Sequence, residues 1–248
     1  MRKKPIILLT NDDGIDAKGL VALKKDMAKL GEVWVVAPDK EQSATSHSLT
    51  LTRPLRTKKL GPRVFSVDGT PTDAVMVAVY ALMKKRPNLI ISGINHGSNL
   101  GDDVTYSGTV AAAMEGTILR IPSIAVSMCN WEKGSFKAGA RFVLMLSRLV
   151  LKKGLPEDTF LNVNFPFRRN LKNYQITRLG RVSYRDVVIQ KLDPRGQRYY
   201  WIGEQFPFTK AQKQSDFDAI KKGLVSITPL HLDMTNYVCM KELKKWKV

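Results

Sequence analysis

Short apolar runs alternate with longer amphipathic stretches along most of the chain. Residues 6–9 form an apolar run between polar residues, as expected of a strand that is buried on both faces. Residues 16–30 carry leucine and methionine at helical spacing and predict a helix that Gly31 closes as a C-cap. A second apolar run at residues 32–37 completes a strand–helix–strand unit, for which the usual crossover is right-handed.

The same alternation continues to about residue 175 and predicts the rest of a core. Thr70 is a suitable N-cap for one of the helices, with Pro71 in its first turn. Strands are expected at residues 64–67, 89–92, 123–127 and 160–165, helices at 70–85, 107–119 and 136–152, an extended segment at 49–56, a turn at Gly61-Pro62, and polar loops at 38–48 and 93–106. This order predicts an α/β fold with a Rossmann-like, doubly wound, mostly parallel sheet.

The pattern changes after residue 175. Residues 184–190 and 198–204 flank an Asp193-Pro194-Arg195-Gly196 turn, which predicts a long, protruding β-hairpin. A late strand at 225–229 and a basic terminal helix at 235–246 follow.

We therefore expect one structural domain with two parts. Residues 1–180 form the Rossmann-like core that carries the candidate site, and residues 181–248 supply the hairpin, a returning strand and the C-terminal helix. Such projections either mediate oligomerisation or form a flap over the same monomer, and the sequence pattern alone favours neither.

Composition and charge narrow the class of protein. The 248 residues are 44% hydrophobic and 25% charged, which is typical of a globular chain with a sizeable core. The N-terminal apolar run is too short for a signal peptide, and no stretch is long enough to span a membrane. Cys129 and Cys239 are the only cysteines, which fits a reducing compartment, so we expect a soluble cytoplasmic protein.

The formal net charge of +18 has two interpretations. It could attract nucleic acid or phosphorylated substrates, or it could reflect a solvated, lysine-rich surface. The basic residues are scattered, and no recognition helix or aromatic platform is evident, which argues against specific nucleic-acid binding. A basic nucleic-acid-binding protein nevertheless stays as an alternative class.

Asp12 and Asp13 are the sharpest chemical feature. Ligands of open α/β sheets bind beyond the carboxyl ends of the strands, and this pair directly follows the first predicted strand. Two adjacent carboxylates repel each other unless a cation or hydrogen-bond donors lie between them. A solvated turn or a helix N-cap would also explain the pair, but the preceding buried strand and the turn-forming Gly14 favour a metal site.

Polar segments also follow the second strand and the strand at residues 89–92, and they offer further oxygen ligands. The hydroxyl of Ser43 and the side-chain carbonyl of Asn95 are the candidates, although either one alone would be a routine turn residue. An all-oxygen set suits Mg²⁺, Mn²⁺ or Ca²⁺ and does not suit zinc.

A helix start supplies a candidate anion site. Ser107, Gly108 and Thr109 open the helix at 107–119, where small hydroxyl residues act either as caps or as an anion cradle. Asn99, in the preceding loop, would add an amide donor. Walker, dinucleotide-binding and G-x-S-x-G patterns are absent from the sequence, and Gly14 stands where an aspartyl-phosphatase motif needs a second Asp.

Four sequence blocks together carry a family resemblance: ILLTNDDGIDAKGL, VVAPDKEQSATSHSLT, DGTPTDAV and SGINHGSNLGDDVTYSGTVAAAMEG. In order and spacing they resemble the survival protein SurE family of nucleoside-monophosphate phosphatases. DPRGQRYYWIGE and GLVSITPLHLDMTN extend the resemblance over almost the whole chain. One departure is His96-Gly97-Ser98, where the family commonly has a basic or small residue and a proline.

The resemblance implies an activity and an assembly. It implies hydrolysis of nucleoside 5′- and 3′-monophosphates, sometimes of short polyphosphate, and an exchanged C-terminal segment that builds homodimers or homotetramers. It implies one divalent metal held by Asp12, Asp13, Ser43 and Asn95, and a phosphate site around Asn99, Ser107, Gly108 and Thr109.

The catalytic roles stay open between alternatives. The attacking group is either a water activated at the metal, or Asp12 or Asp13 acts as base or nucleophile. His96 is either a proton donor to the leaving nucleoside or an ordinary surface-loop histidine. A nucleotide-sensing subunit without catalysis is a further alternative, against which the intact set of candidate ligands argues.

Overall fold

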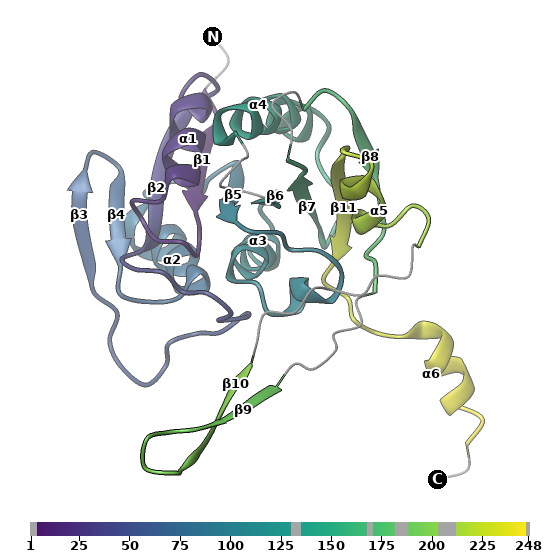
Figure 1. Ribbon diagram of the computed structural model, residues 1–248. Helices are drawn as coiled ribbons and strands as arrows, with labels where there is room; N and C mark the ends of the chain where they lie inside the picture. Colours follow the sequence, from purple (N-terminus) through teal and green to yellow (C-terminus); the bar gives the residue numbers. More distant parts are fainter. Residues whose placement is uncertain (1–3, 130–134, 168–170, 182–187, 203–211, 247–248) are drawn as a thin grey trace.

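A twisted sheet of nine strands runs through the centre of the molecule (Figure 1). The computed structural model describes residues 4–129, 135–167, 171–181, 188–202 and 212–246. In order across the sheet the strands are β3 (Thr57–Gly61), β4 (Val64–Val67), β2 (Glu32–Pro38), β1 (Ile6–Thr10), β5 (Leu89–His96), β6 (Ser123–Met128), β7 (Thr159–Phe165), β11 (Val225–His231) and β8 (Tyr174–Ile176). From β4 to β7 all neighbours are parallel, whereas β3 and β11 run antiparallel to β4 and β7. The predicted mostly parallel α/β sheet is confirmed.

Helices cover both faces of the sheet. One face carries α1 (Lys18–Met27) and α4 (Phe136–Lys153), and the other carries α2 (Pro71–Val77), its continuation η1 (Ala78–Leu82) and α3 (Gly108–Ile118). Strand alternation divides β1 between the two cores: Ile7 and Leu9 pack with α1 and α4, and Leu8 packs with α2. This two-sided burial is why β1 is apolar throughout.

The start of α2 follows the prediction closely. The Thr70 hydroxyl accepts the N–H of Asp73 at 3.1 Å, and the Asp73 carboxylate accepts the N–H of Thr70 at 2.8 Å, which makes a capping box. Pro71 is the first helical residue. The helical segment ends at Leu82, three residues before the predicted end at 85.

Three expectations about the N-terminal half are wrong. Helix α1 ends at Met27 with Ala28 as its C-cap, so Gly31 does not cap it. Gly31 is needed for a different reason, because a Cβ there would lie 2.0 Å from the carbonyl oxygen of Pro5. Residues 49–56 form no regular strand, and the edge strand β3 begins at Thr57. Strand β5 runs on to His96, into the segment predicted as a loop.

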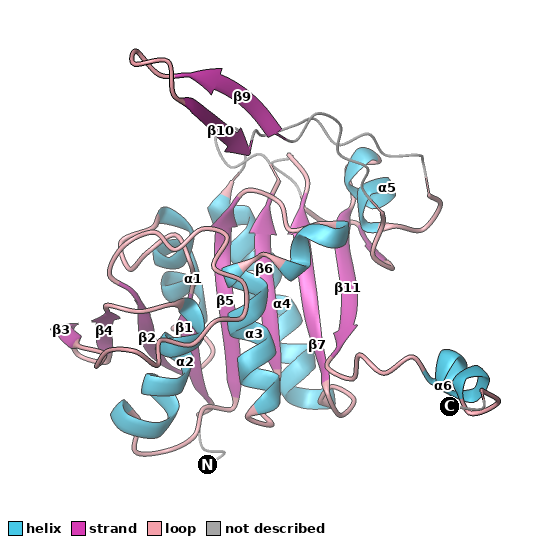
Figure 2. Cartoon of the chain, turned by 90° about the horizontal axis from the view of Figure 1, so that it is seen from below, coloured by secondary structure: helices cyan, strands magenta, loops and turns pink. Residues whose placement is uncertain are grey.

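The C-terminal part contains the predicted hairpin and two unpredicted elements. Strands β9 (Val188–Leu192) and β10 (Arg198–Ile202) pair antiparallel and lie beyond the carboxyl ends of the sheet strands (Figure 2). The hairpin was predicted to extend to 184–187 and 203–204, at the strand ends farthest from the turn, and these residues fall outside the described ones. Strand β8 and helix α5 (Asp216–Lys221) were not predicted.

Helix α6 (Tyr237–Leu243) stands away from the sheet, and none of its residues is buried (Figure 1). In the described part of the chain, no helix combines the length and apolarity that crossing a membrane requires.

Candidate functional site

Asp12 and Asp13 lie in the turn that follows β1. The side chain of Asn11 donates to the carbonyl of Gly14 at 2.8 Å, and Gly14 has a φ of +97°, in the left-handed region. The N–H of Ile15 then donates to the carbonyl of Pro38, at the end of β2, at 2.9 Å. The turn is therefore fixed to the neighbouring strand, and the aspartates between its anchors have little freedom.

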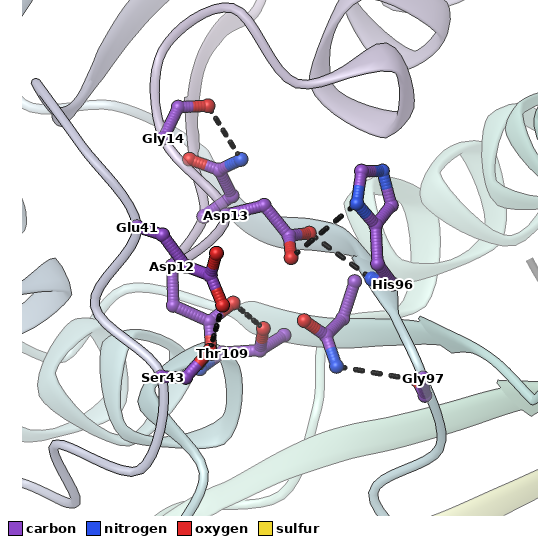
Figure 3. Close-up of polar contacts among 10 residues, drawn as sticks. Asp12, Asp13, Gly14, Glu41, Ser43, His96, Gly97 and Thr109 are labelled. Atoms are coloured by element: carbon purple, nitrogen blue, oxygen red, sulfur yellow. Dashed lines mark hydrogen bonds and ion pairs between the residues drawn. The ribbon is translucent and has the colours of Figure 1, made fainter.

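Helix α3 holds Asp12. The backbone N–H of Thr109 donates to one carboxylate oxygen at 3.0 Å, and the Thr109 hydroxyl donates to the other (Figure 3). A Cβ on Gly108 would lie 3.0 Å from Cβ of Asp12, so the helix start needs glycine at this point. Burial raises the pKa of Asp12 to about 6, against the hydrogen bonds from Thr109, and the charge of Asp13 raises it further.

The end of β5 holds Asp13. Its carboxylate accepts the backbone N–H of His96 at 3.0 Å, and the ring Nδ1 of His96 lies 3.6 Å from its other oxygen. Burial raises the pKa of Asp13 to about 6, and the charge of Glu41 raises it further, against the His96 hydrogen bond. Asp12 is thus a buried carboxylate and Asp13 a partly buried one, and the two carry like charge when ionised.

His96 is not the surface-loop histidine that was the alternative to a proton donor. It is the last residue of β5, its side chain is only 24% exposed, and its ring packs on Phe136 with centroids 5.2 Å apart. Burial, the largest effect, lowers the pKa of His96, which favours the neutral ring.

Ser43 reaches this region on the loop after β2. The N–H of Gln42 donates to the carbonyl of Asp12 at 2.8 Å, which draws the loop onto the aspartate turn. The Ser43 hydroxyl donates to the Glu41 carboxylate at 2.5 Å. Figure 3 shows the side chains of Asp12, Asp13, Ser43 and Glu41 in one region, with His96 at its edge.

The same loop is also fastened to the elements around α3. The N–H of Ser46 donates to the carbonyl of Tyr106 at 3.0 Å, just before the helix begins. Nε2 of His47 lies 2.8 Å from the carboxylate of Glu115, a buried residue of α3. The Ser43 loop and α3 therefore form one connected frame around Asp12.

Asn95 precedes His96 in β5, which puts it beside the Asp13 contact. Its side-chain nitrogen donates to the carbonyl of Gly97 at 3.2 Å. That contact uses the nitrogen, so the oxygen is the atom suited to ligating a cation.

The residues present fit a hard divalent cation. Two adjacent carboxylates, one buried and one partly buried, both have raised pKa values and call for a positive partner. Within the described ranges, no three His, Cys, Asp or Glu side chains form a metal-binding group, so a cation here would use neutral oxygens as well. The candidate donors are oxygens from Asp12, Asp13, Ser43 and Asn95, a set that would suit Mg²⁺, Mn²⁺ or Ca²⁺.

The predicted phosphate residues occupy two places. Ser107 is the N-cap of α3, where its hydroxyl accepts the N–H of Val110 at 3.1 Å, and Thr109 binds Asp12. Gly108 lies between them against Asp12. Asn99 is buried elsewhere on the same face of the sheet, with its side-chain nitrogen donating to Ser127 at 2.7 Å.

Sequence reasoning missed several residues that shape the site. Glu41 acts on both Ser43 and Asp13, and nothing in its polar loop distinguishes it. Asn162 and Asn164 both donate to the carbonyl of Asn99. The sequence does indicate these two, because asparagines at alternate positions interrupt the apolar part of β7.

Comparisons with known proteins agree with this geometry. The profile of the family "Survival protein SurE" matches residues 7–186. The chain is 51% identical over 245 residues to the 5′-nucleotidase SurE of Geotalea daltonii, which covers 98% of this chain and 99% of that protein. It is 52% identical over 243 residues to the 5′-nucleotidase SurE of Pelobacter propionicus, covering 97% and 98%.

A solved structure shows the same fold. The SurE protein from Aquifex aeolicus superposes with a TM-score of 0.87 at 46% sequence identity, covering 97% of this chain and 98% of that one. The family profile spans most of the core, and the two relatives and the solved structure cover nearly the full length. This chain therefore belongs to the SurE family.

Proposed function

We propose that this protein is a metal-dependent nucleotidase that hydrolyses nucleoside 5′- and 3′-monophosphates to nucleoside and phosphate. The observation that carries the proposal is the adjacent pair of buried Asp12 and partly buried Asp13, held between the start of α3 and the end of β5. The relatives named 5′-nucleotidase SurE, about half identical over nearly the full length, support the same reaction.

One divalent cation per subunit, Mg²⁺, Mn²⁺ or Ca²⁺, would be held by Asp12, Asp13, Ser43 and Asn95. When bound, such an ion supplies Lewis acidity toward a phosphoryl oxygen and lowers the pKa of water. The support is the oxygen-only donor set and the raised pKa values of the two aspartates.

Asp12 and Asp13 have different tasks in this proposal. Thr109 engages both oxygens of Asp12, which fixes that carboxylate in orientation. Asp13 accepts one backbone hydrogen bond, from His96, so it is the less constrained of the two and the better suited to orient the attacking water. The pKa of the His96 ring is lowered, which argues against the ring as a proton donor. The backbone N–H of His96 positions Asp13 instead.

The start of α3 would bind the phosphoryl group. Backbone amides at a helix N-terminus stabilise negative charge, and Ser107, Gly108 and Thr109 form this end of the helix beside Asp12. Asn99 would complete the phosphate site. The net charge of +18 favours approach of anionic substrates, including short polyphosphate.

The hairpin and α6 would build a homodimer or homotetramer. They project from the sheet and expose large apolar side chains, among them Trp201 (62% exposed), Ile202 (81%), Tyr237 (57%) and Val238 (77%). Apolar surface of this kind is typical of contact with a partner copy. We place the protein in the cytoplasm on the support of its two unpaired cysteines.

The test is release of phosphate from a panel of nucleoside monophosphates and polyphosphate, with Mg²⁺, Mn²⁺ or Ca²⁺ and with a chelator. Asp12→Asn and Asp13→Asn should each abolish release. Asp158→Asn is the matched control, because Asp158 is a partly exposed residue before β7 with a φ of 53°, which asparagine also tolerates. Full activity in chelator, or in Asp13→Asn, would make the proposal wrong.

A basic nucleic-acid-binding protein is the second candidate, because of the net charge and one basic hollow. Lys4, Arg63, Lys85 and Arg86 line a cavity of about 870 Å³ at the amino end of the sheet. That function predicts tight DNA or RNA binding that weakens steeply with salt, which a filter-binding titration measures. Phosphate release by the wild type in the same panel would exclude the other alternative, a nucleotide sensor without catalysis.

A further inference from the structure

The main chain of Asn99 is held by a side chain of β7. Oδ1 of Asn164 accepts the N–H of Asn99 at 2.9 Å, and Nδ2 of Asn164 donates to the carbonyl of Asn99 at 2.9 Å. One carboxamide thus satisfies both main-chain groups of Asn99, as a neighbouring strand would. The carbonyl of Asn99 also accepts from Asn162 at 2.9 Å.

The side chain of Asn99 is held from β6, where Ser127 accepts its Nδ2 at 2.7 Å. Ser127, Asn162 and Asn164 are all completely buried, and Asn99 is 6% exposed. Both the position of this residue and the direction of its carboxamide are therefore fixed by polar groups inside the fold.

Burying the carboxamides of Asn162 and Asn164 requires free energy that an apolar side chain would not need. Their side chains share a face of the sheet with Phe160 of β7, which packs in an apolar cluster with Val110 and Ala113 of α3. A polar group buried in such a place costs free energy unless it is fully hydrogen-bonded, and an apolar residue there would serve packing as well. Packing of the core therefore does not explain them.

The path of the chain shows what they do. Strand β5 pairs with β6 as far as His96, and the N–H of Gly97 still donates to the carbonyl of Met128 at 3.2 Å. Two residues later, Asn99 bonds with Asn164 of the next strand across. The carboxamide of Asn164 thus takes over the role of a strand where the loop leaves the sheet.

We propose that Asn164 is a positioning residue for phosphate binding, which acts through Asn99, with Asn162 and Ser127 in support. The inference rests on the proposed function, because Asn99 belongs to the proposed phosphate site. Asn164 does not itself touch the phosphate.

The loop is also held two residues beyond Asn99. The N–H of Gly101 donates at 2.7 Å to the carboxylate of Asp216, which is buried and also accepts from Gly180 at 2.8 Å. Loss of the Asn164 contact therefore frees Asn99 while Gly101 stays in place. We expect a local change in phosphate binding without collapse of the loop.

The experiment compares Asn164→Ala with Thr228→Val. Thr228 of β11 lies opposite Asn162 in the sheet, is equally buried, and hydrogen-bonds Thr177 at 2.7 Å without touching Asn99. Asn164→Ala should raise the inhibition constant of inorganic phosphate and lower kcat/KM by about 10- to 100-fold, whereas Thr228→Val should change either by less than about twofold. Equal effects of the two variants would overturn the proposal.

A double-mutant cycle tests whether Asn164 acts through Asn99. In an Asn99→Ala background, Asn164→Ala should change the inhibition constant by less than about twofold, because the positioned group is already absent. Additive effects would overturn the proposal, and so would a parallel loss of Mn²⁺ affinity, which would indicate general damage to the site.

Two further arms keep the test decisive. If Asn164→Ala does not fold, Ser127→Ala removes only the contact to the Asn99 side chain, and it should weaken phosphate inhibition by about 3- to 10-fold; no change would overturn the proposal. A wild type that releases no phosphate would refute the proposed function instead. Calorimetric titration with inorganic phosphate would then compare the same variants for binding.

Discussion

Replacing Asp12 by asparagine is expected to stabilise the metal-free protein above about pH 6. The Asp12 carboxyl is buried, and its pKa is raised from 3.8 to about 6. The folded state therefore binds this proton more tightly than the unfolded state does. Between these two pKa values the free energy of unfolding falls as pH rises, and above about pH 6 the full penalty of the ionised group is present.

The size of the effect follows from the pKa. One pKa unit corresponds to about 1.4 kcal/mol. The difference between 3.8 and about 6 therefore means that ionised Asp12 destabilises the metal-free fold by on the order of 3 kcal/mol. Asparagine removes the charge and keeps the shape. The Thr109 hydroxyl can turn to accept from the new amide nitrogen, so the variant resembles the protonated aspartate. For a chain of 248 residues the gain corresponds to a rise in Tm of about 6–12 °C.

The assay is urea unfolding in chelator from about pH 4 to about pH 8, for wild type and Asp12→Asn. The two curves should meet near the low end and separate through about pH 6. Asp68→Asn is the opposite control, because backbone and side-chain hydrogen bonds from Arg56 and Arg53 lower the pKa of Asp68. That variant should lose stability above the unfolded pKa, a loss that fades as pH falls through the folded pKa.

One result would refute the reasoning directly: Asp12→Asn less stable than wild type at neutral pH in chelator. In that case the hydrogen bonds to the ionised Asp12 carboxylate would outweigh the free-energy cost of burying it. With saturating Mn²⁺ the order should reverse, because only the wild type offers two carboxylates to the cation. Absence of that reversal would count against the metal site and leave the burial argument intact.

Three other variants or conditions test other parts of the site. Gly108→Ala should lower kcat by more than about tenfold and destabilise the fold by about 1–3 kcal/mol, because the new Cβ would lie 3.0 Å from Cβ of Asp12. Gly61→Ala is the control and should change kcat little, because the nearest atoms to its new Cβ are 4.0 Å away. Asp216→Ala leaves three backbone N–H groups without their acceptor and should cost about 3 kcal/mol or more in urea unfolding. Phosphate should bind the metal-free protein at least about tenfold more weakly at pH 8 than with Mn²⁺ in calorimetry, since ionised Asp12 repels it.

Features set by short-range rules could be predicted from the sequence. The apolar runs at β1, β2 and β6 are strands because both of their faces are buried. The N-cap at Thr70 and Pro71 in the first turn depend only on adjacent residues, so their prediction is confirmed, and the structure adds a capping box with Asp73. The position of Asp12 and Asp13 beyond the end of β1 follows from sheet topology, which the alternation of elements already implies.

Features that depend on distant partners could not be predicted in this way. Gly31 resembles a helix cap, yet its role is set by Pro5, which lies alongside only after folding. Thr109 resembles part of an anion cradle, yet Asp12, 97 residues away in the sequence, takes both of its donors. Asn162 and Asn164 stand out as polar residues in an apolar strand, but their target, Asn99, is 63 and 65 residues away.

The contacts of Asp12 change how the two halves of the site relate to each other. The start of α3 was expected to serve phosphate, and Asp12 to serve a cation. In the structure the positive end of the helix already faces the Asp12 carboxylate, so phosphate and Asp12 compete for the same dipole. A cation on Asp12 would neutralise the carboxylate and leave the helix end to an incoming anion. We therefore expect metal and phosphate binding to be coupled through Asp12 and Thr109, so that neither half of the site works alone.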